Sequence, residues 1–259
     1  MITSNSNPKV KYVRRLQAER RTREREGAFV IEGTRWLGEL IPFREQVEFI
    51  FCTESWQAAP PNRALLEQLD APAYPVSESV LAEASDTETP SGVLAVVRQQ
   101  PRPLPTAPNL LLILDRLADP GNLGTIIRAS AAAGIDGILL APGSVDLYNP
   151  KVVRASMGAL LRLPVHAASW DEIGSLVRGL NVWLAAAGGE RAYTAVDWRE
   201  PSALIIGSEA RGAGAEASQL AGGEIAIPIQ AQTESLNAAV AAAVILFEAI
   251  RQRSVIGNP

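Results

Sequence analysis

One segment in the middle of the chain constrains the fold more than any other. It starts with the apolar, β-prone run Leu110–Leu114 and ends with a second apolar run at Gly137–Leu140. Between them lie a glycine-bearing loop, Asp119–Gly124, and the alanine-rich stretch Thr125–Ala133, which predicts a helix. Two strands joined through such a long crossover run parallel in one sheet. The segment therefore predicts a βαβ unit and an α/β fold with a parallel sheet.

More strands extend this sheet towards the C-terminus. Short apolar runs predict strands at Pro164–Ala167, Val182–Ala187, Ala203–Ile206 and Glu224–Ile227. A longer alanine-rich stretch predicts a final helix over Ser235–Arg253. We therefore expect residues 109–259 to form one α/β domain.

The first hundred residues predict a second, smaller α/β domain. Strand-like runs at Phe29–Gly33, Val47–Cys52 and Gly92–Arg98 alternate with helix-like runs at Thr34–Leu40 and Arg63–Leu69. After them, regular structure is interrupted by Pro101, Pro103, Pro105 and Pro108. A chain of 259 residues is long enough for two domains. We therefore expect domains at 1–100 and 109–259, joined by an extended linker at 101–108.

The charge of the chain is unevenly distributed. The formal net charge is −4, yet residues 9–25 hold eight basic residues against two acidic ones. Val10, Val13 and Leu16 lie at helical spacing within this basic arm, so we expect a helix that directs its arginines outward. Two readings stay open for the arm alone, a solvated helix face and a surface that binds nucleic acid.

Features that the sequence lacks exclude several classes of protein. No apolar run reaches the roughly 18 to 20 residues that cross a bilayer, and the N-terminus has no apolar signal core. We therefore expect a cytoplasmic protein without a membrane partner.

The scarcity of histidine and cysteine excludes several kinds of site. His166 is the only histidine, so a Ser-His-Asp triad or a multi-histidine metal site cannot be built from this chain, and we expect no metal. Its position in an apolar strand favours a structural role. The single cysteine, Cys52, ends a predicted strand and is expected to be a small buried apolar residue.

Three polar clusters follow predicted strands, at the edge where parallel sheets bind ligands. The first, Asp119–Arg128, lacks the glycine spacing of a dinucleotide fingerprint, although a Rossmann-type nucleotide enzyme stays an alternative. In the second, Ile205–Gly212, Glu209 and Arg211 can also form a mere surface ion pair.

The third cluster, Ile225–Asn237, joins a strand to the last helix. Thr233 or Ser235 can cap that helix, and Asn237 is expected in its first turn with its amide directed back towards the loop. The polar residues of this cluster, like those of the other two, can therefore have either a structural role or a role in binding or catalysis.

Taken together, in this order and spacing, the three clusters resemble the motifs of the SpoU/TrmH group of SPOUT methyltransferases. The match covers roughly Leu110–Arg253. The resemblance implies transfer of a methyl group from S-adenosylmethionine to a ribose 2'-hydroxyl of RNA. It also implies a homodimer and a trefoil knot over about Ala203–Phe247, a topology that general rules of chain connection disfavour.

The same resemblance implies which residues form the site. The catalytic residues would be Asn122, Arg128, Glu209, Ser235 and Asn237. The cofactor would be held, largely through backbone groups, by Ala186, Ala187, Gly188, Gly207, Ile227 and Leu236. In the family the arginine equivalent to Arg128 has been regarded as the base, but a guanidinium stays protonated and has no free acceptor. We expect Arg128 to bind a phosphate or the developing alkoxide instead, with Glu209 or water taking the proton.

The N-terminal part is similar to the substrate-binding domain that precedes the catalytic domain in many family members, a fold related to a ribosomal protein. The similarity is carried by Asn7–Lys11 and Phe29–Gly33. It implies RNA contacts from Lys9, Lys11, Arg14, Arg15, Arg21 and Arg35. Ribosomal (23S) RNA is the expected substrate, and the alternatives are a tRNA 2'-O-methyltransferase and a non-catalytic RNA-binding protein.

Overall fold

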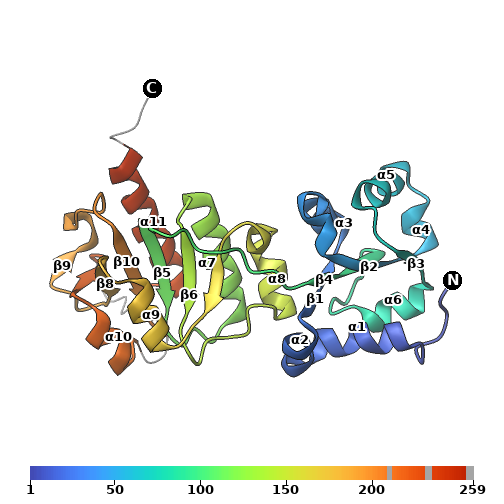
Figure 1. Ribbon diagram of the computed structural model, residues 1–259, viewed down its shortest axis with the longest axis horizontal. Coiled ribbons are helices and arrows are strands. Elements are labelled where there is room, and N and C mark those ends of the chain that lie inside the picture. Colours follow the sequence, from blue (N-terminus) through green and yellow to red (C-terminus); the bar gives the residue numbers. More distant parts are fainter. Residues whose placement is uncertain (209–211, 231–234, 255–259) are drawn as a thin grey trace. The chain divides into compact units, whose positions relative to one another are not determined.

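The computed structural model describes residues 1–208, 212–230 and 235–254 (Figure 1). The chain forms two compact units, one of Met1–Gln100 with Asp146–Leu161 and the other of Pro101–Val145 with Arg162–Pro259. The units therefore interleave along the chain, whereas a linear division at 101–108 would place residues 146–161 with the second one. Both units are α/β structures.

The first unit is built on a sheet in the order β1-β4-β2-β3. These strands are Ala28–Glu32 (β1), Val93–Arg98 (β4), Val47–Cys52 (β2) and Ala73–Pro75 (β3). β4 runs antiparallel to both of its neighbours, and β3 runs parallel to β2. The strands predicted at 29–33, 47–52 and 92–98 are confirmed, while β3 has no apolar alternation that would predict it.

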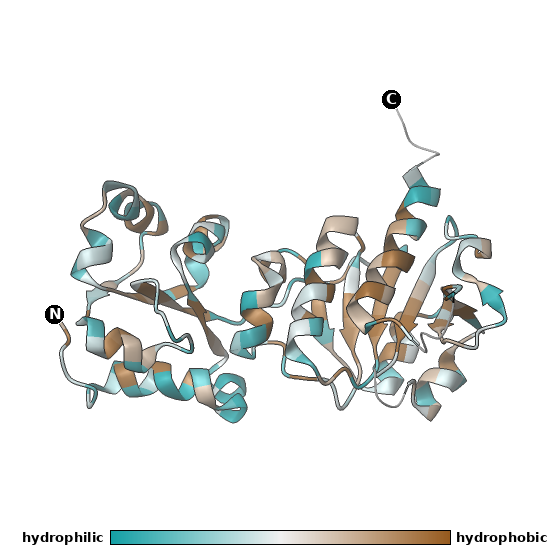
Figure 2. Ribbon diagram, turned by 180° about the vertical axis from the view of Figure 1, so that it is seen from behind, coloured by the Kyte–Doolittle hydropathy of each residue, from teal (hydrophilic) through white to brown (hydrophobic). Residues whose placement is uncertain are grey.

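Helices cover both faces of this sheet (Figure 1). On one face α1 (Pro8–Ala18) and α6 (Glu78–Ala84) pack on alternate strand residues, among them Val30, Phe51 and Leu94. On the other face lie α3 (Thr34–Glu39), α4 (Glu54–Gln57) and α5 (Pro60–Leu69), next to the 3-10 helix η1 (Ile41–Gln46). Figure 2 shows the apolar strands in brown between more polar helices. Cys52 is buried as expected, and burial raises the pKa of its thiol.

The basic arm forms two helices instead of one. The first, α1, begins at Pro8 because the Asn7 side chain accepts a hydrogen bond from the Lys9 amide at 2.9 Å, and a proline at the first helical position costs no hydrogen bond. Its predicted apolar face is confirmed, since Val10, Val13 and Leu16 are fully buried. After a break at Glu19 the chain continues as α2 (Arg20–Glu26).

The expectation that the arginines of the arm point outward is wrong for Arg23. Its guanidinium is buried and donates to Asp146 Oδ2 from Nε (2.8 Å) and Nη2 (2.6 Å). Nη1 donates to the carbonyl oxygens of Leu16 and Gln17, at the end of α1, where helix carbonyls lack partners within the helix. Arg23 is buried because it satisfies these carbonyls and an acid far away in the sequence.

The segment that contains Asp146 belongs to the first unit and packs on its sheet. Its helix α8 (Pro150–Ser156) contacts β1, and the Tyr148 ring lies 4.8 Å from the Phe29 ring. Burial and the charge of Asp146 raise the pKa of Tyr148 to about 12. The short 3-10 helix η2 (Ala159–Leu161) follows. The sequence pattern predicts no element here, since α8 is too short to show periodicity.

The second unit is built on a parallel sheet in the order β7-β6-β5-β10-β8-β11-β9. Its strands are Val165–Ala167 (β7), Gly137–Leu140 (β6), Leu110–Leu114 (β5), Ser202–Ile206 (β10), Asn181–Ala185 (β8), Gly223–Ala226 (β11) and Arg191–Ala192 (β9). Within this sheet every strand pair among the described residues is parallel, so the predicted α/β fold with a parallel sheet is confirmed. Each predicted strand is found to within about two residues.

Two pairs of helices cover this sheet (Figure 1). On one face α9 (Trp170–Leu176) and α10 (Ala215–Leu220) bury Ile173 and Ala217 against strand residues such as Ile113 and Ile205. On the other face α7 (Pro120–Ala133) and α11 (Ala238–Ser254) pack against each other, beside the 3-10 helix η3 (Tyr193–Ala195). No helix among the described residues is both long and apolar enough to span a bilayer.

Two helix starts differ from the prediction. The expected loop Asp119–Gly124 is mostly the first turn of α7, because Asp119 accepts a hydrogen bond from the Asn122 amide at 2.7 Å and Pro120 fits the first position. The last helix begins at Ala238, and Asn237 caps it by accepting from the amides of Ala239 (2.9 Å) and Val240 (3.2 Å). Asn237 therefore takes the capping role suggested for Ser235, while Thr233 lies outside the described residues.

The buried pair of Arg23 and Asp146 generates a stability prediction. Replacing Arg23 by Ala leaves a nearly buried carboxylate without its partner, and we expect the free energy of unfolding to fall by about 3 to 5 kcal/mol. The control is Arg20→Ala on the same helix, which removes an exposed pair with Glu24 and should cost about 0 to 1 kcal/mol. Urea denaturation of both variants tests the difference, and equal losses would contradict it.

Candidate functional site

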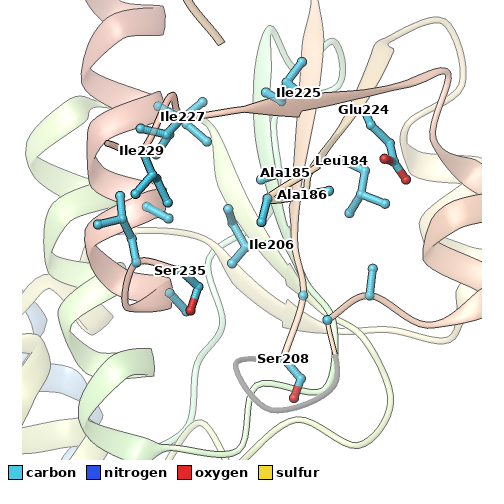
Figure 3. Close-up of a pocket in the computed structure, with 18 of the residues that line it drawn as sticks. Leu184, Ala185, Ala186, Ile206, Ser208, Glu224, Ile225, Ile227, Ile229 and Ser235 are labelled. Carbon is cyan, nitrogen blue, oxygen red and sulfur yellow. The ribbon is translucent and has the colours of Figure 1, made fainter. Parts of the chain in front are cut away.

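A cavity of about 360 Å³ opens at the carboxyl ends of β8, β10 and β11 (Figure 3). Four stretches of chain form its walls, namely residues 184–187, 206–208 with 212–213, 224–229, and 235–245 together with Ser218 of α10. Because the three strands run parallel, the stretches 184–187, 206–208 and 224–229 lie at one edge of the sheet, and α11 and α10 supply the rest of the wall. The cavity has the size of a site for a small molecule or cofactor.

The walls of the cavity differ in character on its two sides. Ile206, Ile227 and Ile229 lie near the start of α11 and make one side apolar, with the Ser235 hydroxyl at its rim (Figure 3). Glu224 lies on the opposite side beside Leu184, and its carboxylate is the charged group that the described walls supply. Such walls suit a ligand with a flat apolar part and a polar part that donates hydrogen bonds.

Five of the six residues predicted to hold the cofactor line this cavity: Ala186, Ala187, Gly207, Ile227 and Leu236. The sixth, Gly188, follows them in the chain but is absent from the lining. Gly207 leaves no room for a side chain, because a Cβ there would come within 2.6 Å of the Ala213 nitrogen and the Gly212 carbonyl carbon. The contact of these residues with a cofactor stays a prediction.

The residues predicted to be catalytic come partly together. The Asn237 amide donates to Asn122 Oδ1 at 3.0 Å, which joins the first cluster on α7 to the third cluster at the start of α11. Ser235, two residues earlier, lines the cavity. Arg128 is exposed on α7, beyond the first turn that holds Asn122. Glu209 lies outside the described residues.

The six residues predicted to bind RNA do not form one surface of the first unit. The Lys9 ammonium lies 4.7 Å from the centroids of the Phe49 and Tyr74 rings. Arg14 pairs with Glu83 at 2.7 Å, and Arg15 lies 3.8 Å from Glu19. Pairing with acids lowers the positive potential that the sequence suggests for this arm.

The other three predicted RNA-binding residues are exposed. Lys11 lies on α1 and Arg21 on α2, whereas Arg35 lies on α3, which covers the opposite face of the sheet (Figure 1). The structure therefore separates Arg35 from the residues of the arm.

Two further residues at this edge of the sheet were not singled out from the sequence. Glu224 lines the cavity and lies on β11, directly before the third cluster. Asp115 is 1% exposed, directly after β5, and accepts a hydrogen bond from the Gly214 amide at 2.6 Å. Asp115 could have been found from the sequence, because it is an acidic residue directly after the apolar run 110–114. His166 has the structural role expected of it, since its Nε2 lies 2.6 Å from the Arg102 carbonyl oxygen.

Comparisons with known proteins agree with this geometry. Residues 109–247 match the SpoU rRNA methylase family, and residues 7–95 match an MRM3-like substrate binding domain. The chain is 35% identical to an uncharacterised tRNA/rRNA methyltransferase of Synechocystis, over 100% of this chain and 96% of that one. It is 32% identical to the 23S rRNA guanosine 2'-O-methyltransferase RlmP of Bacillus subtilis, over 95% and 97% of the two chains.

Solved structures give the same result. The SpoU methyltransferase AviRb of Streptomyces viridochromogenes, in complex with the cofactor AdoMet, has a TM-score of 0.89 at 28% identity and covers 97% of this chain and 100% of that one. An AdoMet-bound rRNA methyltransferase from Sinorhizobium meliloti has a TM-score of 0.84 at 29% identity, covering 96% and 97%. The family resemblance of the three clusters is thus confirmed, and the chain belongs to the SpoU/TrmH family of RNA methyltransferases.

Proposed function

We propose that this protein transfers a methyl group from S-adenosylmethionine to a ribose 2'-hydroxyl of ribosomal RNA. The observation that carries the proposal is that the hydrogen-bonded pair Asn122–Asn237 lies next to the cavity. Asn237 follows directly after Ser235 and Leu236, which line the cavity. A site for a small cofactor thereby adjoins polar groups that can hold a second substrate. Relatives named as 23S rRNA 2'-O-methyltransferases and AdoMet-bound neighbours support this reading.

The residues of the cavity fit S-adenosylmethionine, which supplies an electrophilic methyl group when bound. The apolar side around Ile227 and Leu236 suits the adenine ring. Gly207 lines the cavity and packs without a side chain against Gly212 and Ala213, and the backbone groups of 186–188 offer donors and acceptors at the end of β8. We assign the cofactor to these six residues, with Glu224 as a further polar contact.

In this proposal the protein acts mainly by position and charge. Transfer of a methyl group from a sulfonium requires the ribose oxygen to approach in line, so correct placement supplies much of the rate. Asn122 and Asn237, held together, orient the ribose, while Arg128 binds the neighbouring phosphate or the developing alkoxide. Glu209 or water takes the proton, because a guanidinium has no free acceptor.

The role of Arg128 is tested by replacing it with Ala. We expect kcat to fall by about 100-fold or more, as for other groups that stabilise developing charge, while the Kd for S-adenosylmethionine stays unchanged. The kcat of Arg128→Lys should lie between those of the wild type and Arg128→Ala, because lysine keeps the charge but loses the forked geometry of the guanidinium. The matched control is Arg178→Ala, an exposed arginine just before β8 at the opposite edge of the sheet. Weakened cofactor binding with a normal kcat would contradict the assignment.

The first unit is the proposed RNA-binding part, and its match to an MRM3-like substrate binding domain supports this role. The division along the sequence into a substrate domain at 1–100, a linker at 101–108 and a methyltransferase domain at 109–259 stays part of the proposal, although residues 146–161 belong to the first compact unit. We keep the proposed contacts to RNA phosphates, from Lys9, Lys11, Arg14, Arg15 and Arg21 on α1 and α2 and, on the other face of the sheet, from Arg35 on α3. A ribosomal RNA substrate also favours a cytoplasmic location.

The substrate is identified by incubating the protein with labelled S-adenosylmethionine and total bacterial RNA, followed by mapping of the 2'-O-methylated position. We expect label in 23S ribosomal RNA. Label in transfer RNA would support the alternative substrate. Binding of RNA without any transfer, together with no heat of S-adenosylmethionine binding in calorimetry, would support the non-catalytic alternative.

We further propose that the protein is a homodimer that uses α11, within a knotted C-terminal region. Val240 and Phe247 are 48% and 50% exposed, and their spacing of seven residues places them on one face of this helix. Two large apolar side chains on one exposed helix face favour contact with a second copy.

Sedimentation tests this proposal. We expect a dimer at micromolar concentration, and we expect Phe247→Glu to shift the protein towards monomer because a buried charge at the interface is costly. The control is Leu176→Glu on α9, which is 41% exposed on the other face of the sheet and should leave the dimer intact. A monomeric wild type would contradict the proposal.

A further inference from the structure

Asp115 holds both ends of the loop that follows β10. Its backbone N–H donates to the carbonyl of Ile206, the last residue of β10, at 2.9 Å. Its side chain accepts from the amide of Gly214, the residue before α10, at 2.6 Å. Asp115 itself is fixed by its place at the end of β5, which pairs with β10 along its whole length. One residue thus links the point where the loop leaves the sheet to the point where it enters the next helix.

The two flanks of this loop contribute Gly207, Ser208, Gly212 and Ala213 to the cavity wall, and Gly214 follows directly on the second flank. Ser208 and Gly212 exchange two backbone hydrogen bonds, of 3.0 and 2.8 Å. Gly207 lies against Gly212 and Ala213 with no space for a side chain. Because Gly207, Ser208, Gly212 and Ala213 all line the cavity, any shift of the flanks changes its shape.

Arg116 balances the buried charge of Asp115. Its Nε lies 3.3 Å from Asp115 Oδ1, and its backbone has a φ of +53°, which is uncommon for a residue with a side chain. Two glycines give its side chain space: a Cβ on Gly143 would come within 3.1 Å of Arg116 Cγ, and one on Gly214 within 2.9 Å of Nη2. A buried carboxylate is costly unless it is paired, and here an amide and a guanidinium supply the partners.

We infer that Asp115 is a positioning residue, which fixes the flanks of this loop and thereby keeps the cavity in the shape that binds the cofactor. The inference rests on the proposed function for the identity of the ligand. It assigns to Asp115 no contact with the ligand, so its effect is transmitted through Gly214. Loss of the carboxylate should therefore weaken cofactor binding more than it reduces the rate at saturation.

The test compares Asp115→Ala and Asp115→Asn with the wild type in calorimetric titrations with S-adenosylmethionine and with S-adenosylhomocysteine. We expect Asp115→Ala to raise both Kd values by about tenfold or more, the size of a lost hydrogen bond to a charged group. Asp115→Asn keeps an acceptor for Gly214 but loses the charge, so a smaller increase is expected. If Asp115→Ala does not fold, Asp115→Asn alone still tests the inference.

Asp136 provides a matched control in the same sheet. Its Oδ2 also accepts backbone hydrogen bonds, from Asn109 (2.6 Å) and Leu110 (2.8 Å), but at the start of β5, the opposite edge from the cavity. Asp136→Ala should lower the melting temperature and leave both Kd values within about twofold of wild type, in line with a purely structural hydrogen bond.

Three outcomes are distinguishable. The inference is supported if the Asp115 variants bind the ligands more weakly than the wild type while Asp136→Ala binds them normally. Wild-type Kd values in both Asp115 variants, or equal weakening by Asp115→Ala and Asp136→Ala, overturn it while the proposed function stands. A wild-type protein that binds neither ligand overturns the proposed function and this inference with it.

Discussion

The parallel pairing of β8, β10 and β5 is the constraint on which the site depends. Ile206 is in register with Leu114 on one side and with Ala185 on the other, so the three strands end at one level. The residues that come next, Asp115, Ala186 and Gly207, are therefore neighbours although up to about ninety positions separate them in the chain. Each strand alone is an ordinary apolar run. Because the strands run in the same direction, the turns that follow them lie together and form the cavity.

Two buried acids show how this protein fixes segments that lie far apart in the chain. Asp146 binds a buried arginine that also satisfies the last carbonyls of α1, and Asp115 binds the amide that precedes α10. In both cases the acid and its partner are more than ninety residues apart. A charge buried in this way is tolerated only when the geometry of its partners is maintained. Such contacts resist displacement of the segment, because a hydrogen bond weakens steeply when its distance or angle changes.

The sequence predicted the architecture well because its strands are short apolar runs between glycine and proline, and these depend on local chemistry. It misplaced the start of α7, since the glycines after Pro120 suggested a loop while the Asp119 cap and the proline allow a helix. It missed the short helices α4, α6, α8, α9 and α10, which have at most two turns and therefore show little periodicity. The burial of Arg23 and the bond between Asn122 and Asn237 could not be predicted locally, because they depend on partners 123 and 115 residues away.

The interleaving of the two units has a consequence for how such a protein can be rearranged. The chain passes from the first unit to the second after Gln100, returns after Val145, and leaves again after Leu161. A recombination event with a single breakpoint in the proline-rich stretch would separate β1 from the α8 segment that packs on it. A different substrate-binding domain could therefore replace the first unit only if both of its sequence segments were exchanged, or if the new domain could pack against the existing α8. Changes in substrate recognition are in this way linked to the sequence of the catalytic domain.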